Sequence, residues 1–305
     1  MYSVSTKEQQ YETYVLTDQN SGARLEVVPE RGGIITKWSI NDADITYLNE
    51  ERFEDETKSV RGGFPILFPI CGNLVDNSYE MNGKTYTLQQ HGFAREMPWR
   101  VVDKGVVPDS ENALGSAFIQ IQLTSTAETL AKYPFEFELL YTYRLQGNSV
   151  AIEQQVINRS DAASEQSMPF AAGLHPYFLC DRDAASKSKF ELDFPATQYN
   201  DNVDKQDKTY DGELDWHVPE IDIAFHPLSA QQASVADPNR GIKVEMAYDK
   251  PFNTLVFWTV EGKPFYCLEP WSAPRHVFNT GKDVMAIAPG ESKTLAVTFT
   301  ANIGV

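Results

Sequence analysis

The segment Phe135–Leu145 alternates apolar and polar side chains with a period of two, and this pattern constrains the fold more than any other feature. One face is wholly apolar and consists of Phe135, Phe137, Leu139, Tyr141, Tyr143 and Leu145. The other face includes Glu136, Glu138, Thr142 and Arg144. Successive side chains of a β-strand point to opposite faces of its sheet. The pattern therefore predicts an antiparallel strand with one buried face.

Strand signals recur along the chain, whereas helical signals are weak. β-branched or alternating segments predict further strands at Arg24–Val28, Ile34–Ile40, Ala117–Thr124, Val150–Ile157 and Lys293–Ala301. The turn dipeptide Gly147-Asn148 predicts a hairpin, and only Ala127–Lys132 and Ala184–Ser188 could form short helices. We interpret the polar stretch Tyr199–Leu214 as a solvated excursion within the domain. The sequence thus predicts an all-β fold, a large antiparallel β-sandwich, with residues 1–305 as a single domain.

Charge and cysteine content restrict the partners and the compartment. The net charge is −17 and no basic run occurs, which argues against binding to nucleic acid. Three cysteines without a Cys-x-x-Cys pair favour a reducing compartment and no metal cage. The sequence has no signal pattern at its start and no run of about 18 apolar residues that could span a membrane. We expect a cytoplasmic protein without a membrane partner, either a monomer or a weak homo-oligomer.

Four segments place polar residues among apolar ones and are candidates for a functional site. They are Arg61–Pro69, Gln90–Arg95, Phe170–Phe178 and Phe265–Trp271. The second combines the amide of Gln90, the imidazole of His91 and the guanidinium of Arg95 with small residues between them. Small residues leave room for a ligand, and donors of three geometries suit a ligand with many hydroxyl groups.

Glu269 and His175 are the candidates for proton transfer. Each is an ionisable residue in an apolar segment. Burial raises the pKa of a carboxyl group, which suits a general base working near neutral pH. Structural alternatives stay open for each candidate: a paired core carboxylate for Glu269, a hydrogen-bonded core histidine for His175, and ordinary ion pairs for Arg61 and Arg95.

Other chemistries lack their sequence signals. There is no Gly-x-Ser-x-Gly, no Gly-x-x-x-x-Gly-Lys and no Gly-x-Gly-x-x-Gly that opens a helix. His91 and His175 have no second ligand at metal spacing, so no metal site is expected. His217, His226 and His276 are scattered among polar residues or prolines, and we expect them at the surface.

Taken in order, the four segments resemble the galactose mutarotase-like superfamily of aldose 1-epimerases. They are most similar to its glucose-6-phosphate 1-epimerase (hexose-6-phosphate mutarotase) branch. The matching motifs are Arg61-Gly-Gly-x-Pro65, Gln90-His-Gly-Phe-Ala-Arg95, Gly173-Leu-His-Pro-Tyr-Phe178 and Leu268-Glu-Pro270. Weaker matches are Tyr133-Pro-Phe-x-Phe137, Asn158 and Ala288-Pro-Gly-Glu291. The ordered set spans nearly the whole chain.

The resemblance implies roles for particular residues. It implies a β-sandwich with a sugar cleft on a concave face and no cofactor or metal. Glu269 would be the general base on the anomeric hydroxyl, and His175 the general acid at the ring oxygen. His91 would orient the sugar or polarise its ring oxygen. Asp222 would bind the sugar, with Asp204 as its competitor for that role. The 6-phosphate or sugar hydroxyls would be contacted by Arg61, Gln90 and Arg95.

The function expected from this resemblance is interconversion of the α and β anomers of an aldohexose or a hexose-6-phosphate. A carboxylate and an imidazole with pKa values moved toward neutrality could exchange protons with the ring and anomeric oxygens. Trp271 and Phe93 could cover the apolar face of the sugar. Two alternatives remain open: a sugar-binding or sensing protein without turnover, and a glycosidase that uses Glu269 with Asp222. Because the chain is strongly acidic, the sequence leaves open whether the small-molecule sugar carries a phosphate.

Overall fold

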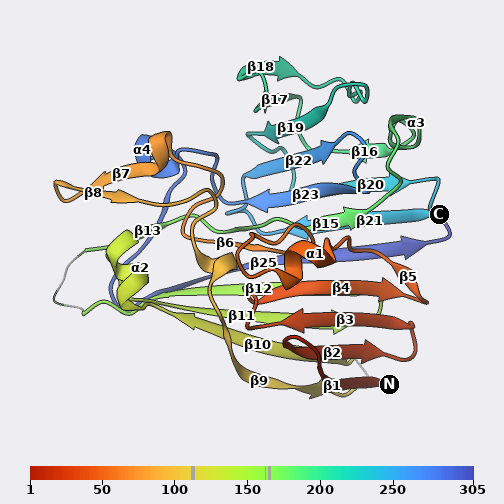
Figure 1. Ribbon diagram of the computed structural model, residues 1–305, viewed down its shortest axis with the longest axis horizontal. Helices are drawn as coiled ribbons and strands as arrows, with labels where there is room; N and C mark the ends of the chain where they lie inside the picture. Colours follow the sequence, from red (N-terminus) through yellow and green to blue (C-terminus); the bar gives the residue numbers. More distant parts are fainter. Residues whose placement is uncertain (111–113, 162, 164–165) are drawn as a thin grey trace.

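The longest strands form an eight-stranded antiparallel sheet in the order β16-β20-β21-β25-β12-β11-β10-β9 (Figure 1). The computed structural model describes residues 1–110, 114–161, 163 and 166–305. The strands of this sheet are β9 (Arg100–Val107), β10 (Ser116–Thr124), β11 (Phe137–Gln146), β12 (Ser149–Asn158), β16 (Glu191–Asp193), β20 (Gln232–Asp237), β21 (Ile242–Tyr248) and β25 (Ser292–Ile303).

The alternation predicted for Phe135–Leu145 is confirmed in β11, where every second side chain is buried. The strand begins two residues later than predicted, because the Phe135 N–H donates to the Tyr133 carbonyl in a tight turn, 2.8 Å away. The predicted hairpin is also confirmed, with Gln146 of β11 paired to Ser149 of β12.

A second eight-stranded sheet, here called the site sheet, has the order β18-β17-β19-β22-β23-β14-β6, and β15 also pairs with β23. Its strands are β6 (Ile66–Leu67), β14 (Gly173–Leu174), β15 (Tyr177–Leu179), β17 (Gln198–Asp201), β18 (Gln206–Thr209), β19 (Glu220–Phe225), β22 (Thr254–Val260) and β23 (Phe265–Trp271). The stretch Tyr199–Leu214, interpreted as a solvated excursion, instead contributes the β17–β18 hairpin to this sheet.

A five-stranded sheet is formed by the first part of the chain. Its strands are β1 (Tyr2–Glu8), β2 (Glu12–Asp18), β3 (Ala23–Val28), β4 (Ile34–Ile40) and β5 (Ala43–Asp44). Two small pairs consist of β7 (Ser78–Met81) with β8 (Lys84–Thr87), and β13 (Met168–Phe170) with β24 (Met285–Ile287).

Helices are few and short. They are α1 (Glu50–Glu54), α2 (Ala127–Lys132), α3 (Ala184–Lys187), α4 (Val277–Thr280) and the 3₁₀ turns η1 (Val75–Asn77) and η2 (Ala94–Glu96). The two predicted helices are present as α2 and α3. Thr126 caps α2 through a reciprocal pair of hydrogen bonds with Thr129, which satisfies free N–H groups of the first turn. In the part of the chain that is described, no helix has the length and apolar character needed to cross a membrane.

Aromatic side chains join the sheets into one core. The ring centroid of Phe299 on β25 lies 5.1 Å from that of Phe64, which stands next to β6 of the site sheet. It lies 5.8 Å from that of Phe178, which is on β15 of the same sheet. The five-stranded sheet is tied to the same core, since the Tyr143 hydroxyl of β11 donates to the Gly33 carbonyl at 2.7 Å. Face-to-face packing of this kind buries the apolar side of each sheet, and it confirms the predicted antiparallel β-sandwich.

Candidate active site

All seven residues selected from the sequence line one cavity of about 360 Å³. They come from separate parts of the chain: Arg61, Gln90, His91, Arg95, His175, Asp222 and Glu269. Side chains of β15, β19, β22 and β23 of the site sheet line it, and so do residues of the loops before β6 and η2. Convergence of distant polar residues on one hollow marks this cavity as the candidate active site.

Glu269 lies in the fully buried strand β23 and is 1% exposed. Its Oε2 accepts a hydrogen bond from the indole Nε1 of Trp271 at 3.0 Å. Burial, and then the charge of Asp222, raise the pKa of Glu269 well above its usual 4.5. Burial disfavours the charged form of a carboxyl group, so Glu269 holds a proton more readily than a free carboxylate would.

His175 faces Glu269 from the turn between β14 and β15. Its backbone N–H donates to the Pro65 carbonyl at 3.0 Å, and its ring stacks on that of Tyr177 at a centroid distance of 4.8 Å. The imidazole Nε2 is 3.4 Å from Oε1 of Glu269. This separation allows a proton to pass between the two groups when a sugar oxygen or a small movement shortens it.

The pKa of His175 moves in the direction opposite to the one predicted. Burial, and then the positive charges of Arg95, Arg275 and Arg61, lower the pKa of His175 from 6.5 to about 3. The raised pKa of Glu269 opposes the negative charge that would otherwise raise the pKa of the imidazole. Burial in this cavity therefore favours the neutral forms of both His175 and Glu269.

His91 is held in one tautomer by the backbone. The backbone N–H of His91 donates to the Gly72 carbonyl at 2.6 Å, and the ring Nδ1 of His91 accepts from the Gly72 backbone N–H at 3.1 Å. Burial, and then the charge of Arg95, lower the pKa of His91 well below 6.5, so the ring is neutral. Since Nδ1 is an acceptor, the proton of the neutral ring is on Nε2. His91 can therefore donate a hydrogen bond through Nε2 but is not free to take up a proton there.

Gly72 connects His91 with Arg275 and leaves no space for a side chain. Its φ is +69°, and a Cβ at this position would lie 2.5 Å from Cγ of Arg275 and 3.2 Å from the Trp271 ring. We expect Gly72→Ala to destabilise the fold by about 1–3 kcal/mol, because alanine tolerates the left-handed backbone less well than glycine and its Cβ would also clash with Arg275. Thermal unfolding measures this. Gly83→Ala, where φ is +72° but no atom lies within 4 Å, is the matched control and should cost less. Equal losses for both variants would contradict the close-packing argument.

Asp222 is the aspartate that lines the cavity, and Asp204 is not among its lining residues in the described chain. Arg275 Nη2 donates to Oδ2 of Asp222 at 3.0 Å, and Asn202 Nδ2 donates to Oδ1 at 2.8 Å. Asp204 instead forms an ion pair with Lys208 and is 42% exposed. Position therefore favours Asp222 over its competitor.

Arginine side chains also line the cavity, and they include Arg61 and Arg95. Arg61 and Gln90 are exposed at the rim, whereas the Arg95 side chain is only 20% exposed. Arg95 Nη2 donates to the Gln90 carbonyl at 3.1 Å, and its Nε lies 3.3 Å from Oε1 of Glu96. Arg52 of α1 also lines the cavity, although no local sequence pattern indicated it. A buried guanidinium loses solvation, and an anionic ligand would restore favourable interactions.

Aromatic residues line the cavity, but not all those predicted. Trp271 lines it, together with Tyr177 and Trp258. Phe93 was predicted to cover a sugar and instead packs in the core, with its ring stacked on Phe137 at 5.7 Å. The first turn of η2 carries Phe93 away from the cavity, while His91 and Arg95 point into it. The further lining residues that sequence reasoning missed are Arg52, Ser59, Val60, Glu220, Val256, Trp258 and Arg275.

Three groups at the centre of the site could in principle hold a metal ion. Ligand atoms of His175, Cys267 and Glu269 all lie within 4.8 Å of one another. Burial, and then the charge of Glu269, raise the pKa of the Cys267 thiol well above 9.0. Metal binding requires both the thiol and the carboxyl group to lose their protons, and burial opposes this loss. The donor set therefore fits a proton-transfer site better than a metal site.

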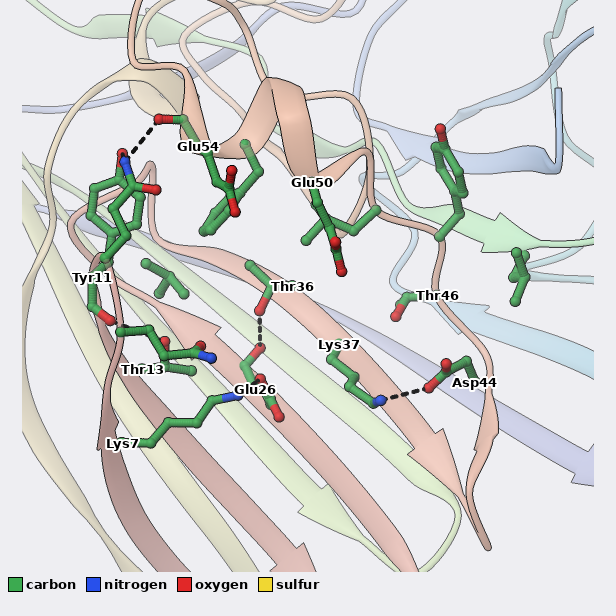
Figure 2. Close-up of a pocket in the computed structure, with 17 residues that line it drawn as sticks. Lys7, Tyr11, Thr13, Glu26, Thr36, Lys37, Asp44, Thr46, Glu50 and Glu54 are labelled. Atoms are coloured by element: carbon green, nitrogen blue, oxygen red, sulfur yellow. Dashed lines mark hydrogen bonds and ion pairs between the residues drawn. The ribbon is translucent and has the colours of Figure 1, made fainter.

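Two larger hollows lie elsewhere on the surface. One, of about 600 Å³, lies between α1 and the five-stranded sheet and is lined by Lys7, Glu26, Lys37 and other charged residues (Figure 2). The other, of about 850 Å³, lies beside the β17–β18 hairpin and is lined in part by His226 and His276. These two histidines were expected at the surface and are instead half-buried, whereas His217 is exposed as predicted. Neither hollow is lined by any of the seven predicted residues, all of which are described.

The all-β sandwich has the fold of a solved galactose mutarotase-like protein from Clostridium acetobutylicum, which is 16% identical to this chain with a TM-score of 0.79 and covers 99% of each chain. A model of the aldose 1-epimerase family matches residues 14–300, so the chain belongs to the aldose 1-epimerase family. The structure of Slr1438 protein from Synechocystis sp. PCC 6803 has a TM-score of 0.89 to this chain at 41% identity, covering 99% of this chain and 100% of that one.

Two relatives known by sequence are more distant. Protein LacX of Lactococcus lactis subsp. lactis is 27% identical over 274 residues, which cover 82% of each chain. An Escherichia coli K12 protein whose name proposes glucose-6-phosphate 1-epimerase activity is 26% identical over 149 residues, or 48% of this chain and 42% of that protein.

Proposed function

We propose that this epimerase interconverts the α and β anomers of an aldohexose, with Glu269 and His175 as the groups that transfer protons. The observation that carries the proposal is their opposition across 3.4 Å in a cavity lined by hydrogen-bonding groups and aromatic rings. A mutarotase needs one proton removed from O1 and one delivered to O5, and this pair offers both functions. Asp222 has its carboxylate engaged by Arg275, which disfavours its use as a glycosidase carboxylate.

The reaction starts from the form in which one proton is shared by the pair. Its transfer from Oε1 of Glu269 to Nε2 of His175 gives a carboxylate and an imidazolium. Glu269 then takes the O1 proton while the C1–O5 bond breaks, and O5 takes the proton of His175. The open-chain aldehyde rotates about C1–C2. On reclosure O5 attacks C1, O5 returns its proton to His175, and O1 recovers a proton from Glu269. The pair ends with the proton count with which it began.

The remaining polar residues hold the sugar. His91 donates through Nε2, because its Nδ1 is occupied by the Gly72 N–H. Asp222, oriented by Arg275 and Asn202, accepts from sugar hydroxyls. Trp271, Trp258 and Tyr177 offer apolar faces to the ring carbons. Groups fixed in advance in this way lower the entropic and reorganisation cost of the reaction.

We further propose that the preferred substrate is a hexose-6-phosphate, with the phosphate on the Arg61 and Arg95 side. Both arginines, and Arg52 with them, line one side of the cavity in a chain of net charge −17. The positive charges of Arg95 and Arg61 help to lower the pKa of His175. A bound phosphate would offset these charges and so favour the imidazolium that protonates O5. The E. coli relative's name supports the same substrate class.

Anomerisation rates test the proposal directly. Freshly dissolved α-anomers of glucose and galactose are followed by polarimetry, and glucose-6-phosphate by an anomer-specific coupled assay. We expect a rate above the spontaneous one for at least one sugar, and the highest kcat/KM for the phosphorylated one. Binding of the sugars without any acceleration would identify a binding protein instead. Equal kcat/KM for all three would reject the phosphate preference.

The pH dependence of kcat/KM with glucose tests the shared proton. The pair gains a second proton only near the pKa of His175, about 3, and loses its single proton as pH rises through the raised pKa of Glu269. We therefore expect kcat/KM to show no fall near the usual histidine pKa of 6.5 on the acid side and to decline on the alkaline side. Rates from about pH 5 to about pH 9, corrected for the uncatalysed reaction, measure this. An acid limb centred near 6.5 would contradict it.

A further inference from the structure

The loop Asn49–Arg61, here called the strap, carries part of the arginine side of the cavity. Its ends are joined, because the Asn49 N–H donates to the Arg61 carbonyl at 2.9 Å and Leu48 bridges to Gly62 beyond it. Helix α1 begins inside the strap, where the Asn49 side chain accepts from the Arg52 N–H at 2.9 Å. A compact closed loop of this kind can present several side chains to one site.

The strap separates its charges between its two sides. Arg52 and Arg61 line the candidate active site. Glu50 and Glu54 instead line the hollow of about 600 Å³, where they extend from α1 toward the five-stranded sheet (Figure 2). The active-site side of the strap is therefore basic although the strap contains several acidic residues. The affinity of that side for an anion depends on how firmly the strap is held in this orientation.

A buried guanidinium contacts several backbone carbonyls of the strap. Arg31, in the turn between β3 and β4, is 7% exposed. Its Nε donates to the Phe53 carbonyl at 3.1 Å, and its Nη2 donates to the carbonyls of Asp55 at 3.0 Å and Lys58 at 2.6 Å. The planar fork of a guanidinium can satisfy several carbonyls of fixed geometry at once, which a lysine ammonium on a flexible stem does less well.

The same turn also supports Arg95. Gly32, next to Arg31, has a φ of +86°, and a Cβ there would lie 2.1 Å from the carbonyl oxygen of Arg95. The strap and the Arg95 segment are linked again at the rim, where the Ser59 hydroxyl donates to Oε1 of Glu96 at 2.8 Å, and Arg95 Nε lies 3.3 Å from the same oxygen. One turn of the five-stranded sheet therefore sets the position of both groups of arginines.

From these contacts we infer that Arg31 is a positioning residue that sets the specificity of the enzyme for a phosphorylated sugar. It holds the strap so that Arg52 and Arg61 face the anion, and it lies behind the strap, outside the described residues that line the cavity. The inference rests on the phosphate preference proposed above. Because Arg31 does not line the cavity that holds Glu269 and His175, its effect falls on binding of the anionic part of the substrate and not on the chemical step.

The test compares Arg31→Lys with Arg24→Lys, a matched change at a half-buried arginine on β3 that pairs with Glu26. We expect Arg31→Lys to raise KM for glucose-6-phosphate about tenfold or more, with kcat for that sugar and kcat/KM for glucose within about twofold of the parent. Arg24→Lys should change none of these values. Equal losses with both sugars would show that Arg31 has only a structural role and would overturn the inference.

A double-mutant cycle shows whether Arg31 acts through the strap. In an Arg52→Ala background, Arg31→Lys should raise KM for the phosphorylated sugar by much less than in the parent, because residues that act through one another are not additive. Full additivity would contradict the inference. Calorimetric titration with inorganic phosphate gives a readout independent of turnover: Arg31→Lys should weaken phosphate binding while its melting temperature reports folding.

Failure of the two proposals is distinguishable. If the parent accelerates anomerisation of neutral sugars but neither turns over glucose-6-phosphate nor binds inorganic phosphate, the phosphate preference is wrong, and the role of Arg31 is rejected with it. If the parent prefers the phosphorylated sugar and Arg31→Lys retains that preference, only the inference about Arg31 is wrong.

Discussion

Glu269→Gln is expected to lower kcat for anomerisation by about 10²- to 10⁴-fold while raising the stability of the protein near neutral pH. The amide cannot take the proton of O1, but it keeps the shape of the side chain. Its oxygen can still accept from Trp271 Nε1, and its NH₂ can donate to His175 Nε2, so the buried network stays satisfied. Polarimetry and thermal unfolding of the same preparation measure both effects.

The stability change has a defined pH dependence. The pKa of Glu269 is raised in the folded protein, so folding favours its protonated form. The stability that this provides is fully present below the pKa of the unfolded chain and is lost as pH rises through the folded value. Each unit by which folding raises the pKa of Glu269 corresponds to about 1.4 kcal/mol of this stability. The stability gain of Glu269→Gln over the parent should therefore grow with pH and vanish in acid.

Glu220→Gln is the matched control. Glu220 also lines the cavity and accepts from a tryptophan, since Trp258 Nε1 donates to its Oε1 at 2.7 Å. It is exposed, so its loss of rate should be far smaller. If Glu269→Gln kept more than about a tenth of the parent rate, the assignment of Glu269 as general base would be wrong.

The fold could be predicted because its main signal is local. Alternation in β11 depends only on neighbouring residues, and it indicated the strand and its buried face before any partner was known. The order of the strands could not be predicted in this way. Strand β25, from the end of the chain, inserts between β12 and β21, and this pairing depends on contacts across about half of the sequence.

The site could be predicted only in part, because local sequence signals reveal some of its residues while others are placed by long-range contacts. Each of its motifs carries a local anomaly, a polar group in an apolar segment, and the cavity brings all seven of those residues together. Arg52 gave no such signal, since its position depends on a strap held by Arg31. Trp258 faces the cavity because β22 pairs in register with β19, opposite Asp222. The prediction that Phe93 covers the sugar was wrong, because proximity in sequence to His91 does not fix the direction of a side chain across a turn.

The unexpected pKa direction of His175 has the same origin. Burial could be expected from its apolar segment, but Arg61, Arg95 and Arg275 come from three other parts of the chain, and only the fold brings their charges near. Their combined field disfavours an imidazolium in this cavity. A substrate that carries negative charge to this side would reverse that effect, which connects substrate charge to proton transfer.

Arg95→Ala is expected to raise KM for glucose-6-phosphate by about 10- to 150-fold and to change kcat/KM for glucose and galactose far less. The Arg95 side chain is largely buried and lies beside Gln90 at the arginine side of the cavity, where a bidentate contact with phosphate would be little screened by salt. Arg95→Lys keeps the charge but loses the fork, so its effect should be intermediate. Arg100→Ala, an exposed arginine that contacts Gln122 on β10, is the control and should affect none of the three sugars.

A second consequence of Arg95→Ala separates binding from proton transfer. Arg95 is, after burial, the first of the groups that lower the pKa of both His175 and His91. Its removal should raise the pKa of both imidazoles, which NMR titration of the histidine resonances can follow. In the parent, inorganic phosphate should raise the pKa of His175 in the same direction, because the anion offsets the same charge. If Arg95→Ala lowered kcat/KM equally for all three sugars, and phosphate left the histidine resonances unchanged, the substrate would be a neutral hexose whose hydroxyls Arg95 contacts.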